Sequence, residues 1–229
     1  MNTQAISNLL STFALFQELD RSELAEIIEI GIVRAFKKGS HIFLQDEPLK
    51  NVFLIFNGKI KIYKTDLNGK EQIVAVLKKG EMFPHIGFFR KGGYPAFAEV
   101  QEDAVLVKIP TKKFEEVLMG NPKLCMKVFK VLGEKVVDLQ DRLGEQILNN
   151  TYEQLIKLLF RLSKTYGRKL ENGSVLLTEN FTNIELANMI GTSRETVSRT
   201  LSKWKKERII CIHEGKMMID TEQLLDKLF

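Results

Sequence analysis

The sequence predicts an α+β chain: an antiparallel β-roll or jelly roll, then a long helix, then a small domain dominated by helices. Three observations predict this order. Short apolar segments alternate with glycine-containing turns as far as residue 109. Apolar residues then recur at intervals of three and four across 122–148, and two short helices joined by a tight turn follow at 182–204. With 229 residues, the chain is long enough for two small domains.

The first half of the chain predicts the antiparallel roll. Between Gly31 and Ile109, apolar and polar residues alternate, as they do in strands with one buried face. Asn57-Gly58 and Asn68-Gly69 carry the strongest short hairpin signal, so we expect a turn at each. Several short strands at this spacing are typical of a barrel or jelly roll. The expected strands are Val52–Phe56, Ile60–Tyr63, Ile73–Leu77 and Val105–Ile109, and the expected flanking helices are Ile6–Phe13, Ser22–Glu29 and Lys112–Met119.

Residues 122–148 predict one long helix with an apolar stripe. The stripe has the spacing of a coiled-coil seam, and the residues opposite it are mostly charged. Two interpretations stay open: the stripe pairs with a second copy of the chain, or it packs on the chain's own barrel. We expect pairing, because an exposed apolar stripe of this length favours association. Its residues are Leu124, Val128, Leu132, Val136, Leu139, Leu143 and Ile147.

The last third predicts a winged helix-turn-helix. Asn149-Asn150-Thr151 interrupts the helical pattern and is the expected hinge. A helix at Tyr152–Lys164, a strand at Ser174–Leu177 and a hairpin at Ile209–Ile219 surround the helix pair. We therefore expect a β-roll domain at 1–120, a dimerisation helix with its hinge at 121–149, and the winged domain at 150–229.

The helix pair at 182–204 has clear start and stop signals. Thr182 and Glu185 have the spacing of a capping box, so the first helix begins there. Gly191 suits the left-handed residue that ends a helix, and Ser193 can cap the second helix. Because two short helices joined in this way can present the second one to the major groove, the segment is a candidate DNA-binding motif.

The second helix has an apolar face and a polar face. Val197, Leu201 and Trp204 share the apolar face. On the polar face, arginine can donate to guanine, glutamate can accept from cytosine, and serine can take either role. Similar helix pairs occur in proteins that never touch DNA, where such a face is simply solvated. The polar face carries Arg194, Glu195, Ser198 and Arg199.

The segment SRETVSR, Ser193–Arg199, closely resembles the recognition helix of the CRP/FNR family of bacterial transcription regulators. The resemblance covers the whole order of elements, and it implies a sensor domain like those that bind cyclic nucleotides. By this resemblance Arg194, Glu195 and Arg199 match the base-reading positions of the CRP branch. Glu195, Ser198 and Arg199 match those of the FNR branch. The candidate phosphate contacts are Thr182, Thr192, Ser193 and Lys203.

The resemblance implies a homodimer that binds double-stranded DNA at a palindrome with TGA-containing half-sites, and that acts with RNA polymerase, more often as an activator than as a repressor. From Arg194 to Arg208 there are six Lys or Arg residues against two Glu, a basic excess that suits phosphate contacts. The alternative is a ligand-sensing interaction module that uses the same helix pair to bind protein.

The cyclic-nucleotide site of the family is altered in this chain. In nucleotide-binding members, a glycine–glutamate pair binds the ribose, an arginine–serine pair binds the phosphate, and two hydroxyl residues contact adenine. Proline and alanine cannot replace the guanidinium, so we do not expect cAMP or cGMP to bind in the usual way, and the effector is unknown. The corresponding positions are Pro84, His85, Pro95, Ala96, Leu139 and Gln140.

The aromatic residues around these positions leave two possibilities open. They either form plain core, which we favour, or line a site for an apolar ligand. Arg90 and Lys91 could bind another anion, although an exposed hairpin tip is the simpler interpretation. The residues that fill or line this region are Phe83, Ile86, Phe88, Phe89, Tyr94 and Phe97.

No cofactor, metal or catalytic activity is expected. His85 lies one residue before the axial histidine of the family's haem-based sensors, and no second axial ligand is evident. Cys125 and Cys211 are too few for the iron–sulfur cluster of the FNR branch, so we assign the chain to a branch that uses neither cAMP nor iron–sulfur. His41 and His85 are too few for a cupin-like metal site, and no nucleophile–base signature occurs.

The composition is that of a globular chain with a modest basic excess. Hydrophobic residues make up 44%, charged residues 28%, and the formal net charge is +5. No apolar run is long enough to span a membrane, and the first sixteen residues lack the basic leader of a signal peptide. We therefore expect a cytoplasmic protein that does not associate with membranes.

Overall fold

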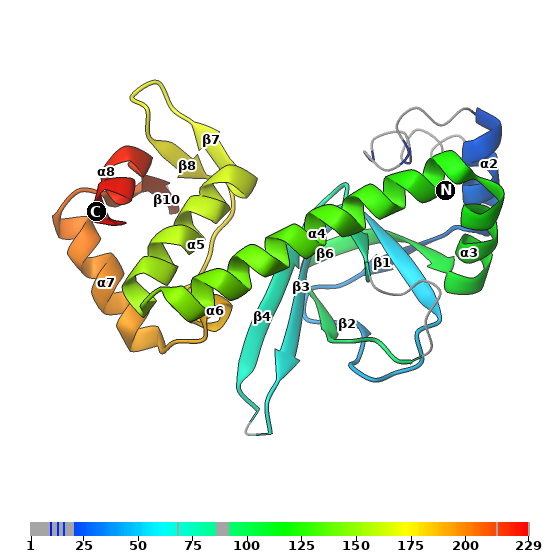
Figure 1. Ribbon diagram of the computed structural model, residues 1–229, viewed down its shortest axis with the longest axis horizontal. Helices are drawn as coiled ribbons and strands as arrows, with labels where there is room; N and C mark the ends of the chain where they lie inside the picture. Colours follow the sequence, from blue (N-terminus) through cyan, green and yellow to red (C-terminus); the bar gives the residue numbers. More distant parts are fainter. Residues whose placement is uncertain are drawn as a thin grey trace. The chain divides into compact units, whose positions relative to one another are not determined.

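The computed structural model describes Leu10, Phe13, Phe16 and residues 21–67, 69–85, 92–213 and 215–228, with backbone alone at 21–23. The expected helix at Ile6–Phe13 lies almost wholly outside these residues. The chain forms two compact units, Met1–Asp138 and Leu139–Phe229, called here the first and second unit (Figure 1). Antiparallel sheets and separate helices confirm the α+β class.

One antiparallel sheet forms the centre of the first unit. Its strand order is β1-β6-β3-β4, with β2 paired to β6 and β5 paired to β3. The long strands β3 and β6 pair along most of their length and so connect all the other strands. The strands are β1 (Ile32–Phe36), β2 (His41–Phe43), β3 (Asn51–Thr65), β4 (Glu71–Leu77), β5 (Met82–Phe83) and β6 (Phe97–Pro110).

The expected turn at Asn57-Gly58 is wrong. Strand β3 is continuous from Asn51 to Thr65, where two strands were expected, and its register with β6 shifts on either side of Asn57. Gly58 has a φ of 95°, and a Cβ there would lie 2.6 Å from the Cα of Ala104. A bulge and a hairpin turn both need a left-handed residue, so the Asn-Gly pair alone cannot distinguish them.

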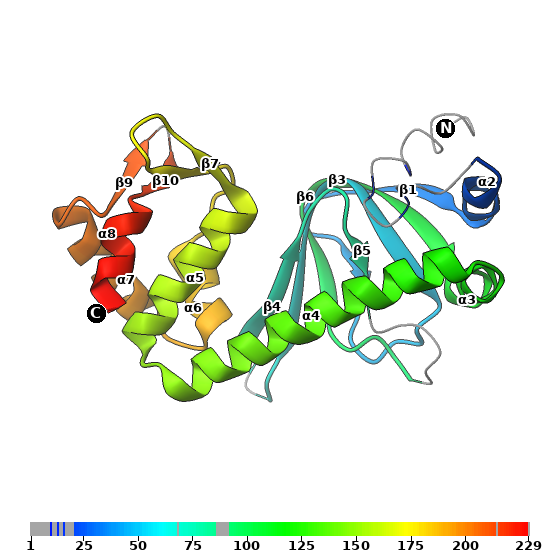
Figure 2. The same cartoon turned by 45° about the horizontal axis from the view of Figure 1, so that its top comes forward.

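Three helices pack on one apolar cluster in the first unit. They are α2 (Arg21–Ile30), α3 (Thr111–Gly120) and the first half of α4 (Pro122–Leu148). Figure 2 shows α2 and α3 side by side near the start of α4. The cluster also contains sheet residues, so α4 begins as an integral part of this core.

The apolar residues of α4 divide between two faces. Leu124 and Val128 are buried in the first unit, and Leu132 packs partly against the same cluster. Phe129 is 59% exposed and lies seven residues, two helical turns, before the exposed Val136. The assignment of Leu124 and Val128 to an exposed seam is therefore wrong, because spacings of three and four fit either face. The stripe continues through Val136, Leu139, Leu143 and Ile147, which are 53–71% exposed.

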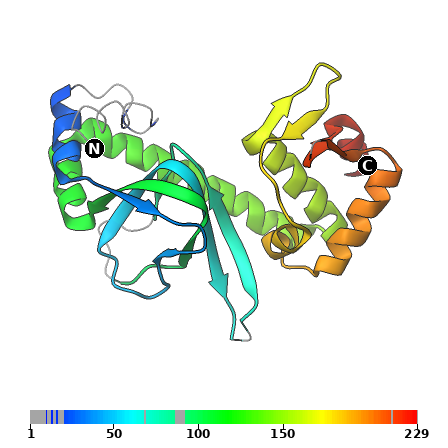
Figure 3. The ribbon, with the colours of Figure 1, turned by 180° about the vertical axis from the view of Figure 1, so that it is seen from behind.

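The second unit contains a four-stranded antiparallel sheet with the order β7-β8-β10-β9. Strands β7 and β8 form the yellow hairpin in Figure 3. The predicted helix pair and wing are present, and strand β7 and the last helices were not foreseen. The elements are α5 (Thr151–Tyr166), β7 (Gly167–Lys169), β8 (Val175–Leu177), α6 (Asn183–Ile190), α7 (Arg194–Lys206), β9 (Ile210–His213), β10 (Lys216–Ile219), α8 (Thr221–Leu225) and the 3-10 turn η1 (Asp226–Leu228).

The turn between α4 and α5, where the hinge was expected, is extensively hydrogen-bonded. Asn150 forms a capping box with Glu153, and Gln154 donates to the carbonyl of Asn149 over 2.9 Å. Arg161 of α5 makes a 2.8 Å ion pair with Glu145 at the end of α4. These bonds join the last turns of α4 to α5, and both lie in the second unit, which begins at Leu139 inside α4.

Replacing Gly58 with alanine should destabilise the first unit strongly. The substitution places a Cβ against β6 and forces a left-handed conformation, at a combined cost of about 3 kcal/mol. Gly80→Ala is the matched control, because Gly80 has a φ of 91° and no atom within 4 Å of an added Cβ. That control should lose only about 1 kcal/mol. Urea unfolding of both variants measures the difference, and equal losses would contradict the close approach at Gly58.

Candidate nucleic-acid interface

Helix α6 begins at the predicted capping box. The Thr182 hydroxyl accepts from the backbone N–H of Glu185 over 3.2 Å. In return, the Glu185 carboxylate accepts from the backbone N–H of Thr182 over 2.7 Å. Both donors would otherwise lack an intrahelical partner, so this local pair determines where α6 starts.

The turn between α6 and α7 follows the expected geometry. Gly191 ends α6 with a φ of 74°, and its backbone N–H donates to the carbonyl of Ala187. Ser193 then caps α7, with its hydroxyl accepting from the backbone N–H of Thr196 over 3.1 Å. Ala187 is only 2% exposed, and its small side chain permits the close approach of the two helices.

The apolar face of α7 determines how the helix is rotated about its axis. Val197, Leu201 and Trp204 are buried in the core of the second unit. The indole Nε1 of Trp204 donates to the hydroxyl of Tyr152 on α5 over 3.0 Å, and the two rings meet edge to face. A buried indole N–H needs such a partner, so this bond and the apolar contacts together hold α7 in one orientation.

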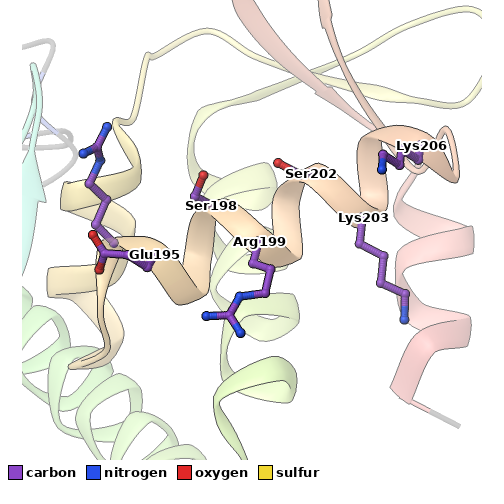
Figure 4. A pocket seen from close by; sticks show the side chains of 7 residues that line it. Glu195, Ser198, Arg199, Ser202, Lys203 and Lys206 are labelled. Carbon is purple, nitrogen blue, oxygen red and sulfur yellow. The ribbon is translucent and has the colours of Figure 1, made fainter.

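The opposite face of α7 brings the predicted base-reading residues together. Arg194, Glu195 and Arg199 are exposed, and Ser198 is half-buried. Figure 4 shows Glu195, Ser198 and Arg199 projecting from successive turns of α7. This face of α7 lines an open hollow, to which Ser202 and Lys206 also contribute. These two residues were not predicted among the DNA contacts, although their spacing along the helix could have indicated them. The described residues that line this hollow are Arg194, Glu195, Ser198, Arg199, Ser202, Lys203 and Lys206.

The charge of this face is mostly positive and uncompensated. Its lining holds four cations against the single carboxylate of Glu195. Within the described ranges, neither Arg194 nor Arg199 forms an ion pair with a carboxylate. Free guanidinium groups on an exposed helix face are suited to acceptors on another molecule, such as base edges or phosphate oxygens.

The predicted phosphate residues lie at the start of each helix and late in α7. The Thr182 and Ser193 hydroxyls are engaged in caps, and the backbone N–H of Thr192 donates to the carbonyl of Ala187 over 3.0 Å. Lys203 is 64% exposed, with its ammonium 3.9 Å from the Glu207 carboxylate. The Lys203 side chain is loosely held, since a distance of this size is a weak pairing.

The predicted effector residues in the first unit are largely core. Phe83, Pro84, Tyr94 and Ala96 are buried, and Pro95 and His85 are half-buried. Tyr94 stacks on Phe43 with ring centroids 3.8 Å apart, and Phe83 stacks on Phe53 at 5.4 Å. Ile86, Phe88, Phe89, Arg90 and Lys91 lie outside the described residues. Leu139 and Gln140 are exposed and belong to the second unit.

His85 is held neutral. Burial, followed by the nearby positive charge of Lys135, lowers the pKa of its imidazole from 6.5 to about 4. Because the predicted phosphate positions Pro95 and Ala96 also carry no charge, these three side chains offer no cation to a bound phosphate at neutral pH.

The described part of the chain contains no group of three or more His, Cys, Asp or Glu side chains placed to hold a metal ion. Cys125 and Cys211 are both free thiols. None of the helices in the same part combines the length and the apolar character needed to span a bilayer.

Two domain families match the chain. The cyclic nucleotide-binding domain matches residues 33–121, within the first unit. The Crp-like helix-turn-helix domain matches residues 153–228, within the second. The matched regions therefore contain all of the first unit's sheet except Ile32, and the whole α6–α7 interface.

Curated relatives share the full length of the chain. A CRP-like cAMP-activated global transcriptional regulator of Mycobacterium tuberculosis is 24% identical over 221 residues, covering 96% of this chain and 98% of the relative. The anaerobic regulatory protein of Bacillus subtilis is 28% identical, with 95% and 92% covered. The fumarate and nitrate reduction regulatory protein of Escherichia coli is 26% identical, with 98% and 88% covered. Proteins of this kind are transcription regulators and not enzymes.

Solved structures share the fold. A CooA mutant from Carboxydothermus hydrogenoformans superposes with a TM-score of 0.76 at 23% identity, covering 96% of this chain and 94% of that one. The c-di-GMP responsive global regulator CLP of Xanthomonas campestris gives 0.75 at 15% identity, with 87% and 99% covered.

Acid should destabilise the protein through His85. Between its ordinary pKa of 6.5 and the folded value of about 4, the unfolded chain binds a proton that the folded chain does not, so stability falls as the pH falls through this window. Between pH 8 and pH 5, the wild type should lose ~1–2 kcal/mol more than His85→Asn, which does not titrate. Urea unfolding at both pH values measures this, and equal losses in the two proteins would contradict a buried neutral imidazole.

Proposed function

The chain belongs to the CRP/FNR family of transcription regulators, and we propose that it binds a palindromic TGA-type site as a homodimer through α7. The observation that carries this proposal is the row of uncommitted polar side chains on α7, directed away from the core by the burial of Val197, Leu201 and Trp204. Other features of the proposal, namely action as an activator with RNA polymerase in the cytoplasm, follow from membership of the family.

The proposed base contacts are those of the exposed face of α7. Arg199 donates two hydrogen bonds to a guanine, and Glu195 accepts one from a cytosine amino group. Arg194 and Ser198 complete the half-site from the adjoining turn of the helix. These roles need side chains without strong internal partners, a requirement that both arginines meet within the described part of the chain.

Phosphate contacts surround this reading face in the proposal. Thr192 and Ser193 lie at the N-terminus of α7, where free backbone N–H groups favour an anion. Thr182 is at the corresponding position of α6, and Lys203 reaches out from the third turn of α7. Since the Thr182 and Ser193 hydroxyls cap their helices, their contacts with phosphate would supplement the caps and not replace them.

Dimerisation is proposed through the exposed part of the α4 stripe. Val136, Leu139, Leu143 and Ile147 repeat every three or four residues with exposed fractions of 53–71%. Burying such a stripe against a second copy removes apolar surface from water, and a two-fold dimer presents two recognition helices to a palindrome.

The proposed effector is something other than cAMP, or none. Positions that should hold the ribose and phosphate are Pro84, His85, Pro95 and Ala96, and His85 is neutral at physiological pH. The relative from M. tuberculosis is named as activated by cAMP, and CLP as responsive to c-di-GMP. Effectors therefore differ between members of one fold, and the four positions Pro84, His85, Pro95 and Ala96 offer no positive charge to a cyclic phosphate.

Arg199→Ala should weaken binding to the specific site by about 1–3 kcal/mol while changing binding to random DNA much less. The site is first selected from a random DNA pool, with and without cAMP, and affinities are then measured at fixed salt by fluorescence anisotropy. Arg168→Ala is the matched control, since it removes one exposed arginine of the same unit from β7. Equal losses for specific and random DNA would make Arg199 a phosphate contact, and enrichment that requires cAMP would contradict the proposed effector.

Leu143→Lys should dissociate the proposed dimer. Each copy loses the burial of one leucine, about 1.5 kcal/mol, so the dimer Kd should rise by about 100-fold. Asp141→Lys adds a lysine on the same helix but away from the stripe, and it should leave the dimer intact. Sedimentation velocity over a range of concentrations measures both. A wild-type monomer, or an unchanged Kd for Leu143→Lys, would count against this interface.

A further inference from the structure

The first unit contains a cavity that neither the DNA interface nor the predicted effector positions explain. It has a volume of about 560 Å³, within the range of small-molecule sites. It opens between β1, β2 and the loop before β3, and its wall includes Arg34, Lys50 and Lys108. Of the predicted effector residues that the structure describes, only Tyr94 takes part in the lining.

The strand register places two of these cations on one face of the sheet. Lys108 of β6 lies opposite Ile32 of β1, and Arg34 lies opposite Leu106. Arg34 and Lys108 are therefore diagonal neighbours across the strand pair, about 7–8 Å apart at the backbone by the geometry of such pairs. Two like charges at this spacing repel each other, and an anion bound between them would offset that repulsion by attracting both.

These cations lack counter-ions. Within the described ranges, no carboxylate forms an ion pair with Arg34, Lys50 or Lys108. Glu47 is the one carboxylate among the described residues of the lining, and its Oε2 already accepts from the backbone N–H of Leu44 over 3.1 Å. These residues supply three cations against one partly engaged carboxylate, a net excess of two positive charges.

The opposite wall is apolar and fixed in place. Phe43 and Tyr94 stack with their planes 4° apart. The Tyr94 hydroxyl donates to the backbone carbonyl of Asn51 and accepts from its N–H, both over 3.1 Å. The backbone N–H of Tyr94 donates to the Glu47 carbonyl over 2.9 Å. Because these contacts exist before any ligand arrives, little ordering is needed on binding.

We propose that this cavity binds a small organic dianion, a phosphate monoester or a dicarboxylate with an apolar body. Arg34, Lys50 and Lys108 pair with the two negative charges, and the apolar body lies toward Phe36 and the Phe43–Tyr94 stack. Arginine and lysine beside an aromatic wall match such a ligand in both charge and shape. The site is separate from α7, so the inference goes beyond the proposed DNA binding.

Tyr94 connects the cavity to the predicted effector segment, because it lines the cavity and is also next to Pro95. Tyr94 precedes Pro95 directly in the chain, and Asp46 and Glu47 hydrogen-bond to its backbone on both sides. A ligand that contacts Tyr94 and Lys50 therefore links the loop before β3 to the segment that holds phosphate in the nucleotide-binding members. Ligand bound only to the folded form should also raise its thermal stability.

Isothermal titration of the full-length protein at pH 8, without DNA, tests the site. Phenyl phosphate, a dianion at this pH, and isophthalate are the probes. Two matched ligands serve as controls for the probes. Inorganic phosphate has the charge without the apolar body, and benzyl alcohol has an apolar body without the charge. We expect saturable binding of one probe molecule per chain, at least about tenfold tighter than that of either matched ligand. No saturation by either probe at millimolar concentration, or equal affinity for inorganic phosphate, would overturn the proposal.

Variants distinguish a specific site from general charge. Arg34→Gln and Lys108→Met should each weaken probe binding by about tenfold, since each removes one charge-assisted contact. Lys64→Met, which removes an exposed lysine from the far end of β3, is the control and should bind as the wild type does. Circular dichroism confirms that all three fold. If Lys64→Met weakened probe binding as much as the other two variants do, the proposed site would be overturned. Binding of polyglutamate in place of the probes would also overturn it and would indicate an acidic protein partner.

Discussion

The burial of one face of α7 is the constraint on which the interface of the second unit depends. Val197, Leu201 and Trp204 enter the core, and the Trp204 indole is anchored to the Tyr152 hydroxyl. A helix with one face held in this way has no freedom to rotate, so the residues between the buried positions must point outward. Arg199, directly between Val197 and Leu201, is exposed for this reason. The helical repeat that places the apolar residues of α7 in the core thus also places its polar residues on the exposed face.

Burial of an apolar face also orients α4, but this helix has apolar residues on more than one face, so some of them stay exposed. Leu124 and Val128 enter the core of the first unit, while Phe129 and Val136 remain exposed. At its other end the helix is joined to α5 by the Glu145–Arg161 ion pair and the capped turn at Asn150. One continuous helix therefore contributes its first half to the core of the first unit and is joined to α5 at its other end by polar contacts. The stripe available to a second copy consists of the apolar residues of α4 that the first unit does not bury.

Local signals predicted the helix boundaries of the second unit well. The capping box at Thr182, the left-handed Gly191 and the cap at Ser193 involve atoms only a few residues apart, so the order of residue types determines their geometry. Long-range pairing was harder to foresee. Gly58 looked like the centre of a hairpin turn, yet it lies in a bulge, because the decisive neighbour is Ala104 on another strand. Leu124 was placed on the wrong face of α4 for a similar reason.

What the sequence by itself determined is the class of the fold, the order of its elements and the row of arginine, glutamate and serine on α7, because periodicity and caps are encoded over a few residues. Only the tertiary structure decided which apolar residues of α4 are buried, that the aromatic side chains Phe83 and Tyr94 are core, and that Arg34 and Lys108 share one cavity. Those outcomes depend on strand register and on contacts between residues tens of positions apart, which no local pattern encodes.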